Sequence, residues 1–501
     1  MTLPATDGIL EKLQALLAYD ASSPLIFSSG LFLFLFAGFM LIYNAFRRAP
    51  MARIVYVILF SLYFYYKSSG IYFLLLIFAA TSDFLIAQGI YRVRSRAAKR
   101  WLVVLSVMVN LGMLGYFKYT NFLVDIANQM FGQGFLQFQN IFLPVGISFF
   151  VFQSMSYTID IYRGQLKPLG NWCDYLFYLS FFPQLVAGPI VRARDFIPQI
   201  RRNPVVVTRE MFGTGVFLIL TGLFKKAIIS DYISLNFVDR IFDEPLLYSG
   251  FECLAGIYGY ALQIYCDFSG YSDMAIGIAL LLGFRFPKNF DAPYKSATIT
   301  EFWRRWHISL SSWLRDYLYI SLGGNRKGKL RTYGNLLVTM VLGGLWHGAA
   351  IRFILWGTLH GVALALHKLW MAVVPGAKAT GAQMHWWSRA AGVQPRLPGL
   401  ADVPRRVDAD RRTDAAPDLL QLQRSNDPAG HRGLRGCLRP DRCGLPAPSH
   451  AGLRRPRGTA PGSQRPAGVA GRDGRRDDLV RDADQIERHT TVHLLSVLKC
   501  V

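Results

Sequence analysis

The side chains best suited to chemistry in this chain are four histidines in its third quarter. No histidine occurs in the first 306 residues, and His307, His347, His360 and His367 then follow in one stretch. His347 lies within "GGLWHGAA" (343–350), a run of small and apolar residues. Burial in a helix bundle disfavours the charged imidazolium, and a general base near neutral pH requires a neutral imidazole. We therefore interpret His347 as a catalytic base, with a histidine that is merely hydrogen-bonded inside the bundle as the alternative.

Two pairs of glycines flank this region. Gly344 and Gly348 are four residues apart, as are Gly357 and Gly361. Glycines at this spacing let a helix approach its neighbours closely, so we expect close helix packing around His347.

The same histidines do not have the spacing of metal ligands. The gaps between them are 40, 13 and 7 residues, and no acidic residue lies between His347 and His367. The six cysteines include no CxxC pair, so they add no zinc pattern. We therefore expect no bound metal.

A second candidate region surrounds His307 and reads "TITEFWRRWHISLSSWLRDYLYISLGGNRKGK" (298–329). Its aromatic and basic side chains at helical spacing are Trp303, Trp306, Trp313, Arg304, Arg305 and Arg315. Such a surface suits the lipid headgroup level of a membrane. It is either a membrane-interface anchor or a platform that binds an anionic acyl donor and holds His307 at the mouth of a site.

A membrane-embedded helix bundle must position these residues. The chain is 52% hydrophobic and 14% aromatic, and its apolar residues come in long runs. Residues 25–45 carry no charge, and residues 71–90 carry only Asp83. With about 20 apolar residues in each span, we expect about ten spans, and the run 251–283 is long enough for more than one. The predicted fold class is all-α: a polytopic transmembrane helix bundle.

Basic loops indicate how the spans are oriented. Arg47 and Arg48 follow the first span, and residues 91–100 form another strongly basic loop. Both are expected on the cytoplasmic side. The next basic loop, 192–202, lies three candidate spans later, and an odd number of spans would place it on the opposite side. We therefore predict a re-entrant segment over "FFPQLVAGPI" (181–190), whose prolines and glycine disrupt a simple helix.

The two ends of the chain differ from its core. Residues 1–24 are expected to form an amphipathic surface helix with leucines on one face. Residues 379–498 contain 20 arginines but no lysine, phenylalanine or tyrosine. A disordered basic tail has such a composition, and so does a GC-rich gene translated in the wrong frame, which is our interpretation of residues 386–501. The membrane core is assigned to residues 25–385.

The net charge of +23 does not indicate nucleic-acid binding. No stretch interleaves basic and aromatic residues as a known nucleic-acid-binding module does. Basic cytoplasmic loops that face anionic lipid account for the charge. We expect membrane lipids as partners, and no nucleic acid.

Five motifs occur in a fixed order along the chain. They are "FLPVGISFFVFQSMSYTIDIYRG" (142–164), "YLSFFPQLVAGPIVR" (178–192), "YCDFSGYSDMAIG" (265–277), "EFWRRWHISLSSWLRDYLYISLGGN" (301–325) and "LGGLWHGAA" (342–350). In this order they resemble the membrane-bound O-acyltransferase superfamily. The resemblance is strongest to its bacterial branch of alginate O-acetylation proteins and the D-alanyl transfer protein of teichoic acid.

The resemblance implies a fold and an activity. The family fold is a ring of tilted helices around a funnel or tunnel through the membrane. An acyl thioester, acetyl-CoA or another, is expected to reach the site from the cytoplasm as donor substrate, without a further cofactor. The acyl group is expected to pass to a hydroxyl on the other side of the membrane. In the alginate-like branch this hydroxyl belongs to an extracytoplasmic, esterase-like acetyltransferase partner or to an exopolysaccharide such as alginate. The location implied is the cell inner membrane, as a multi-pass protein.

The resemblance also assigns residues. His347 matches the catalytic histidine of the family, and His307 matches a second histidine of the bacterial branch. Acyl transfer from a thioester to a hydroxyl requires a base and little other covalent chemistry, and the chain has no GxSxG nucleophile motif, which fits direct transfer. We expect neutral His347 to be the base and His307 to orient or polarise the thioester carbonyl. The residues expected to bind substrate are Trp303, Trp346, Arg304 and Arg305.

Two acids in "YCDFSGYSDM" bear on a competing function. Asp267 and Asp273 are expected to pair with arginine or with helix ends rather than to act in catalysis. The alternative to an enzyme is a polytopic transporter or flippase of a polysaccharide or lipid precursor, in which His347 and Asp267 relay protons. Internal repeats would favour that alternative, and the sequence has no visible repeat.

Overall fold

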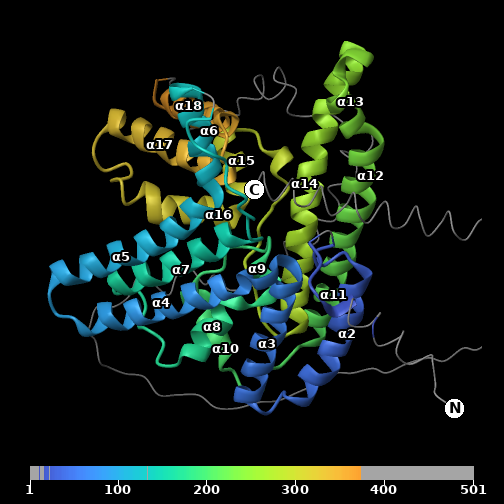
Figure 1. Cartoon of the computed structure of the whole chain (residues 1–501), viewed down its shortest axis with the longest axis vertical. Helices are drawn as coiled ribbons and strands as arrows, with labels where there is room; N and C mark the ends of the chain where they lie inside the picture. The colour runs from blue at the N-terminus through green and yellow to red at the C-terminus, as the bar shows by residue number, and fades with distance from the viewer. Residues whose placement is uncertain (1–10, 12–15, 22, 133, 374–501) are drawn as a thin grey trace, which may run out of the picture. The chain divides into compact units, whose positions relative to one another are not determined.

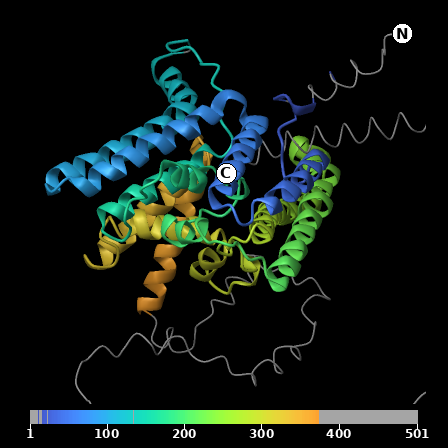
Figure 2. The same cartoon turned by 90° about the horizontal axis from the view of Figure 1, so that it is seen from below.

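The computed structural model describes residues 11, 16–21, 23–132 and 134–373, which belong to one compact unit. This part of the chain consists of helices and loops and contains no strand, so the predicted all-α fold class is confirmed. The helices in chain order (Figures 1 and 2) are α2 (Gly30–Ala45), α3 (Pro50–Ser69), α4 (Phe73–Arg92), α5 (Arg96–Leu114), α6 (Thr120–Phe131), α7 (Ile147–Tyr162), α8 (Trp172–Ser180), α9 (Phe182–Leu185), α10 (Ala193–Ile200), α11 (Arg209–Leu223), α12 (Asp231–Ile233), α13 (Asp239–Asp243), α14 (Gly250–Leu281), α15 (Ile299–Arg305), α16 (Ile308–Trp313), α17 (Lys329–His347) and α18 (Ile351–Val373).

Short turns of other helical types join several of these elements. The 3-10 turns are η1 (Gly70–Tyr72), η5 (Pro245–Leu247) and η6 (Pro293–Lys295). The π-helical turns are η2 (Gly115–Tyr119), η3 (Phe224–Ser230), η4 (Ser234–Val238) and η7 (Leu314–Tyr319). A π turn inserts an extra residue into a helix and often marks a functional position.

Three helical stretches in the described part of the chain are long and apolar enough to cross a membrane. They are Pro50–Arg92, Arg96–Phe131 and Arg209–Asp243, and Gly30–Ala45 is a shorter apolar helix. The protein is therefore a polytopic membrane protein. The number of such stretches is smaller than the expected ten or so, in part because runs counted separately share one stretch or helix: Pro50–Arg92 contains both α3 and α4. The run 251–283, for example, lies almost entirely in one helix of 32 residues, α14.

The segment predicted to be re-entrant does not form a continuous span. Helix α8 ends at Ser180, and α9 has only four residues. Every residue from 181 to 190 is buried. A Cβ atom on Gly188 would lie 2.5 Å from Gln184 Cα, so the chain turns back on itself more tightly than a larger residue permits. This apolar stretch is thus a folded segment inside the protein.

Helices α17 and α18 pack closely through glycines, as the sequence predicts. A Cβ atom on Gly344 would lie 2.2 Å from the carbonyl oxygen of Phe353. A Cβ atom on Gly357 would lie 2.3 Å from the carbonyl oxygen of Met340. Backbone contact of this kind requires small residues at the crossing point. It brings the carboxyl end of α17, where His347 lies, against the first turns of α18.

Two predicted segments fall largely or wholly outside the described residues. The amphipathic helix over 1–24 does so for most of its length, and the tail over 386–501 does so completely. Both assignments stay predictions.

Candidate active site

His307 occupies a strained position between α15 and α16. Its φ of 43° and ψ of 56° place it in the left-handed region, which costs a non-glycine residue free energy. Asn289 holds this corner: its backbone oxygen accepts from Ile308 N at 2.8 Å, and its Oδ1 accepts from Ser309 Oγ at 2.9 Å. Ser272 on α14 accepts from Asn289 Nδ2 at 3.0 Å. The surrounding structure therefore fixes the conformation of His307.

The hydrogen bonds of His307 determine which ring nitrogen carries the proton. Nδ1 accepts from the backbone N–H of Leu310 at 3.2 Å, so it caps α16 and bears no hydrogen. The neutral ring therefore carries its proton on Nε2. This nitrogen is buried and has no hydrogen-bond partner among the described residues. The result is a buried N–H donor that no described residue uses.

The ring of His307 is neutral under physiological conditions. The side chain is completely buried, and α15 and α16, with seven and six residues, are too short to span a membrane. Burial, and to a smaller extent the neighbouring His347, lowers the pKa of His307 to about 3. His307 is thus suited to donate a hydrogen bond and poorly suited to accept a proton.

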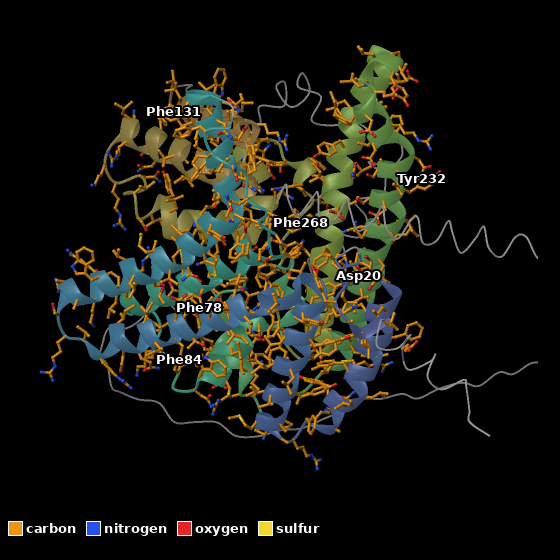
Figure 3. All side chains as sticks on the ribbon, viewed as in Figure 1. Asp20, Phe78, Phe84, Phe131, Tyr232 and Phe268 are labelled. Carbon is orange, nitrogen blue, oxygen red and sulfur yellow. The ribbon has the colours of Figure 1, made fainter. Side chains whose placement is uncertain are left out.

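Aromatic side chains surround the ring of His307. Phe268 on α14 has its ring centroid 4.7 Å away and lies among the interior side chains (Figure 3). The rings of Phe290, Trp346 and Phe149 follow at 6.2, 6.3 and 6.4 Å. All four side chains are buried. An apolar shell of this kind strengthens any hydrogen bond or charge that lies inside it.

His347 is the last residue of α17 and its ring adjoins the Trp346 indole. Its ring centroid is 5.0 Å from that of Trp346 and 5.2 Å from that of Trp356 on α18. The side chain is only half-buried. The structure thus brings two histidines that are 40 residues apart, one enclosed and one partly accessible, next to the same indole.

The cluster continues from Trp356 toward α15. His360 lies 4.5 Å from the Trp356 ring and 5.2 Å from the Trp303 ring, measured between centroids. His360 Nδ1 and Trp303 Nε1 are buried atoms without a hydrogen-bond partner in the described structure. Two turns further along α18, His367 Nδ1 shares a hydrogen bond of 2.9 Å with Thr300 Oγ1. Three of the four histidines and both of the tryptophans predicted to bind substrate therefore form one contiguous group.

The two arginines predicted to bind substrate have different environments. Arg304 is exposed. Arg305 is half-buried and forms ion pairs with Glu301 at 2.8 Å and with Asp291 at 3.8 Å. The pair with Asp291 ties α15 to the loop that carries Asn289, whereas the pair with Glu301 lies within α15. Arg304 is therefore the more accessible of the two cations, and the substrate-binding role of both stays a prediction.

The membrane-embedded acids of α14 pair with lysines rather than with the expected arginines. Asp267 lies 2.8 Å from Lys226, and Asp273 lies 2.6 Å from Lys225. Lys226 also binds Asp231 at 2.7 Å. These side chains are engaged in holding α14 against the turn η3 that follows α11. In the described residues no three histidine, cysteine, aspartate or glutamate side chains converge as metal ligands.

The sequence analysis missed several residues that adjoin the site, and Lys118 is the foremost. It lies in the π turn η2, and its Nζ donates a hydrogen bond to the carbonyl oxygen of Trp346. Asn289 and Trp356 were missed as well, and nothing in their local sequence distinguishes them. A lysine inside the apolar run "LGMLGYFKYTNFL" (111–123) was a usable signal, since an ionisable residue within a membrane span is a functional candidate by default.

Residues 169–389, which include both histidines, match the family model described as MBOAT, membrane-bound O-acyltransferase family. The chain is 46% identical over 351 residues to a "Probable alginate O-acetylase AlgI" of Azotobacter vinelandii, an alignment that covers 69% of each chain. The all-helical membrane fold agrees with these similarities. The chain belongs to the membrane-bound O-acyltransferase family.

Further relatives define the branch of the family. A "Probable alginate O-acetylase AlgI" of Pseudomonas aeruginosa is 45% identical over 351 residues, which are 69% of this chain and 66% of the relative. A "Peptidoglycan O-acetyltransferase" of Helicobacter pylori is 37% identical over 373 residues, which are 69% of this chain and 70% of the relative. The chain thus spans about two thirds of the length of these relatives and lies in the alginate O-acetylation branch.

Proposed function

We propose that this protein is an integral membrane O-acyltransferase that transfers an acetyl group from a thioester to a hydroxyl. The family membership supports the reaction class. The names of the relatives, alginate O-acetylase and peptidoglycan O-acetyltransferase, support a polysaccharide acceptor such as alginate. The donor is acetyl-CoA or a carrier-bound acyl thioester on the cytoplasmic side of the cell inner membrane. The acceptor hydroxyl, on a polysaccharide or an esterase-like partner, approaches from the other side.

The reaction follows from the two imidazoles. His347 takes the proton of the acceptor hydroxyl as its oxygen attacks the thioester carbonyl carbon. The Nε2–H of His307 donates to the carbonyl oxygen and stabilises the negative charge that develops there. The tetrahedral intermediate collapses, the C–S bond breaks, and the leaving thiolate receives the proton from His347. The products are an ester and a free thiol, and no group of the protein is acylated.

One observation carries this assignment of roles. His307 presents a buried N–H without a partner, its ring centroid lies 6.3 Å from that of Trp346, and the half-buried His347 ring lies 5.0 Å from the same indole. A donor enclosed in apolar surroundings suits the stabilisation of an oxyanion. A partly accessible imidazole suits a base that must meet a substrate from solution. The proximity of Trp346 to both rings supports a role for it in lining the substrate paths.

The proposal is tested by acetyl transfer in membranes that contain the full chain. Membranes are incubated with radiolabelled acetyl-CoA and alginate, and the label in the polymer is counted. We expect His347→Ala to lower transfer at least about 100-fold, with protein levels unchanged on immunoblots. Equal incorporation with and without His347 would refute the role of the base. Movement of a precursor across the membrane without acylation would support the transporter instead.

A further inference from the structure

A π-helical turn in a membrane-crossing stretch contacts the end of the helix that carries His347. The stretch Arg96–Phe131 contains α5, the turn η2 and α6. Two consecutive residues of η2, Lys118 and Tyr119, both bind backbone carbonyls of α17. The two segments are more than 220 residues apart in the sequence, since the pairs have separations of 228 and 226.

The carbonyls that they bind are ones that a helix leaves unpaired. The last four carbonyl groups of an α-helix have no N–H donor within the helix, and α17 ends at His347. Tyr119 Oη donates to the carbonyl oxygen of Leu345 at 2.7 Å. Lys118 Nζ donates to the carbonyl oxygen of Trp346, the residue directly before His347. The same ammonium lies 3.4 Å from Ser148 Oγ on α7.

The contact also fixes the indole that adjoins both histidine rings. The Lys118 ammonium lies 5.6 Å from the centroid of the Trp346 ring, within cation–π range. Trp346 Nε1 approaches the backbone oxygen of Ser148 at 3.5 Å. The Lys118 ammonium, the Trp346 indole and Ser148 of α7 thus contact one another at the edge of the site. A rotation of Trp346 would alter the surroundings of His307 and His347 together.

We propose that Lys118 and Tyr119 are positioning residues of the acyl-transfer site, which clamp the last turn of α17 and thereby fix His347 and Trp346. This inference rests on the proposed function of His347 as the base. A cation near a helix carboxyl end is favourable, because the end carries partial negative charge. Lys118 is 9% exposed and lies in a membrane-crossing stretch, where a buried charge is costly and marks a functional position by default.

A matched control exists elsewhere in the same chain. Lys67 lies in another membrane-crossing stretch, is 3% exposed, and also donates to backbone carbonyls, those of Leu16 and Ala18. Replacing either lysine by methionine removes the same chemical group from a similar environment. Any difference between the two variants therefore reports what is particular to the position of Lys118.

The test measures kcat and KM for acetyl-CoA, per amount of folded protein, for Lys118→Met, Lys118→Arg, Tyr119→Phe and Lys67→Met. We expect Lys118→Met to lower kcat about 10- to 100-fold with little change in KM, since a small displacement of a catalytic group costs that much. Lys118→Arg is expected to recover part of the loss because it keeps a cationic donor. Tyr119→Phe is expected to show a smaller loss, and Lys67→Met to keep the kcat of the wild type.

A second readout does not depend on turnover. Modification of His347 by diethyl pyrocarbonate, followed by mass spectrometry, is expected to be faster in Lys118→Met than in the wild type and unchanged in Lys67→Met. If Lys118→Met matches Lys67→Met in both readouts, the proposal is overturned. If the wild type has no transfer that depends on His347, the proposed function fails, while the modification rates still decide whether Lys118 clamps the last turn of α17.

Discussion

Replacing His307 by asparagine separates the roles of its two ring nitrogens. The asparagine Oδ1 lies near the position of Nδ1 and can still accept the Leu310 N–H, which is 3.2 Å from Nδ1 in the wild type. Asparagine also tolerates the left-handed conformation, with φ at 43°, better than most residues do. The variant has no atom at the position of Nε2. It therefore loses the donor to the thioester carbonyl and keeps the helix cap.

The expected loss follows from the proposed role of that donor. Removing one hydrogen-bond donor from an oxyanion site lowers kcat about 100- to 1,000-fold, or ~2.7–4 kcal/mol of transition-state stabilisation. Because His307 is completely buried, water does not readily replace the missing N–H. We expect a loss in this range for His307→Asn, with KM for acetyl-CoA nearly unchanged, because the interaction forms mainly in the transition state.

Glutamine at the same position provides the complementary variant. Its side-chain NH₂ reaches the position of Nε2 and can donate to the carbonyl oxygen, but its oxygen is displaced from the cap. Loss of an N-cap costs about 1 kcal/mol of stability. We expect His307→Gln to keep more activity than His307→Asn and to unfold more easily. The two variants should thus rank in opposite order for kcat and for stability.

The low pKa of His307 adds a pH dependence to stability. In the folded protein its pKa is about 3, against an ordinary value of 6.5. Between these values the unfolded chain binds one more proton than the native state, so stability falls as the pH drops below about 6.5. The difference amounts to about 2 kcal/mol between pH 7 and pH 5. His307→Asn removes this contribution, whereas all other titrating groups are common to both proteins.

The assay combines label transfer at pH 7 with unfolding of purified protein in detergent at pH 7 and pH 5. The wild type should lose more stability on acidification than His307→Asn does. If His307→Asn keeps the kcat of the wild type, the donor role of Nε2 is refuted. An equal loss of stability for both proteins at pH 5 would show that His307 is protonated in the folded state.

The remaining predictions concern stability. Gly344→Ala should destabilise the protein by a few kcal/mol in a detergent melt, because its Cβ would lie 2.2 Å from the carbonyl oxygen of Phe353. Gly334→Ala, on the same helix with nothing within 4 Å, should leave stability equal or slightly higher, by up to about 1 kcal/mol; equal losses for both would contradict the packing argument. Lys226→Met should cost about 3–5 kcal/mol because it leaves Asp267, at 2.8 Å from Lys226, buried with its charge uncompensated. Adding Asp267→Asn should restore much of that loss, and no restoration would argue against the ion pair.

The sequence alone was sufficient for the class of the molecule. Long apolar runs predicted a helical membrane protein, since only helices and closed barrels satisfy backbone groups in lipid. The order of five motifs indicated the family. The glycine pairs of α17 and α18 predicted close helix packing, and Gly344 and Gly357 confirm it. The acids Asp267 and Asp273 were expected to pair with arginine or with helix ends, and their partners are lysines instead.

Tertiary structure decided which atoms meet. Local sequence does not reveal that Nδ1 of His307 accepts from Leu310 or that Asn289 fixes a left-handed corner, so the tautomer of the ring was not predictable. Nor does it reveal that Lys118 binds the carbonyl of Trp346, 228 residues away. Periodicity reports which face of a helix is apolar, whereas a hydrogen bond depends on the relative placement of two helices. The sequence thus determined the membrane fold, the family and the residue types of the site. The backbone turn after His307 decided which nitrogen is free to donate, and the packing of helices distant in sequence decided how the base is held.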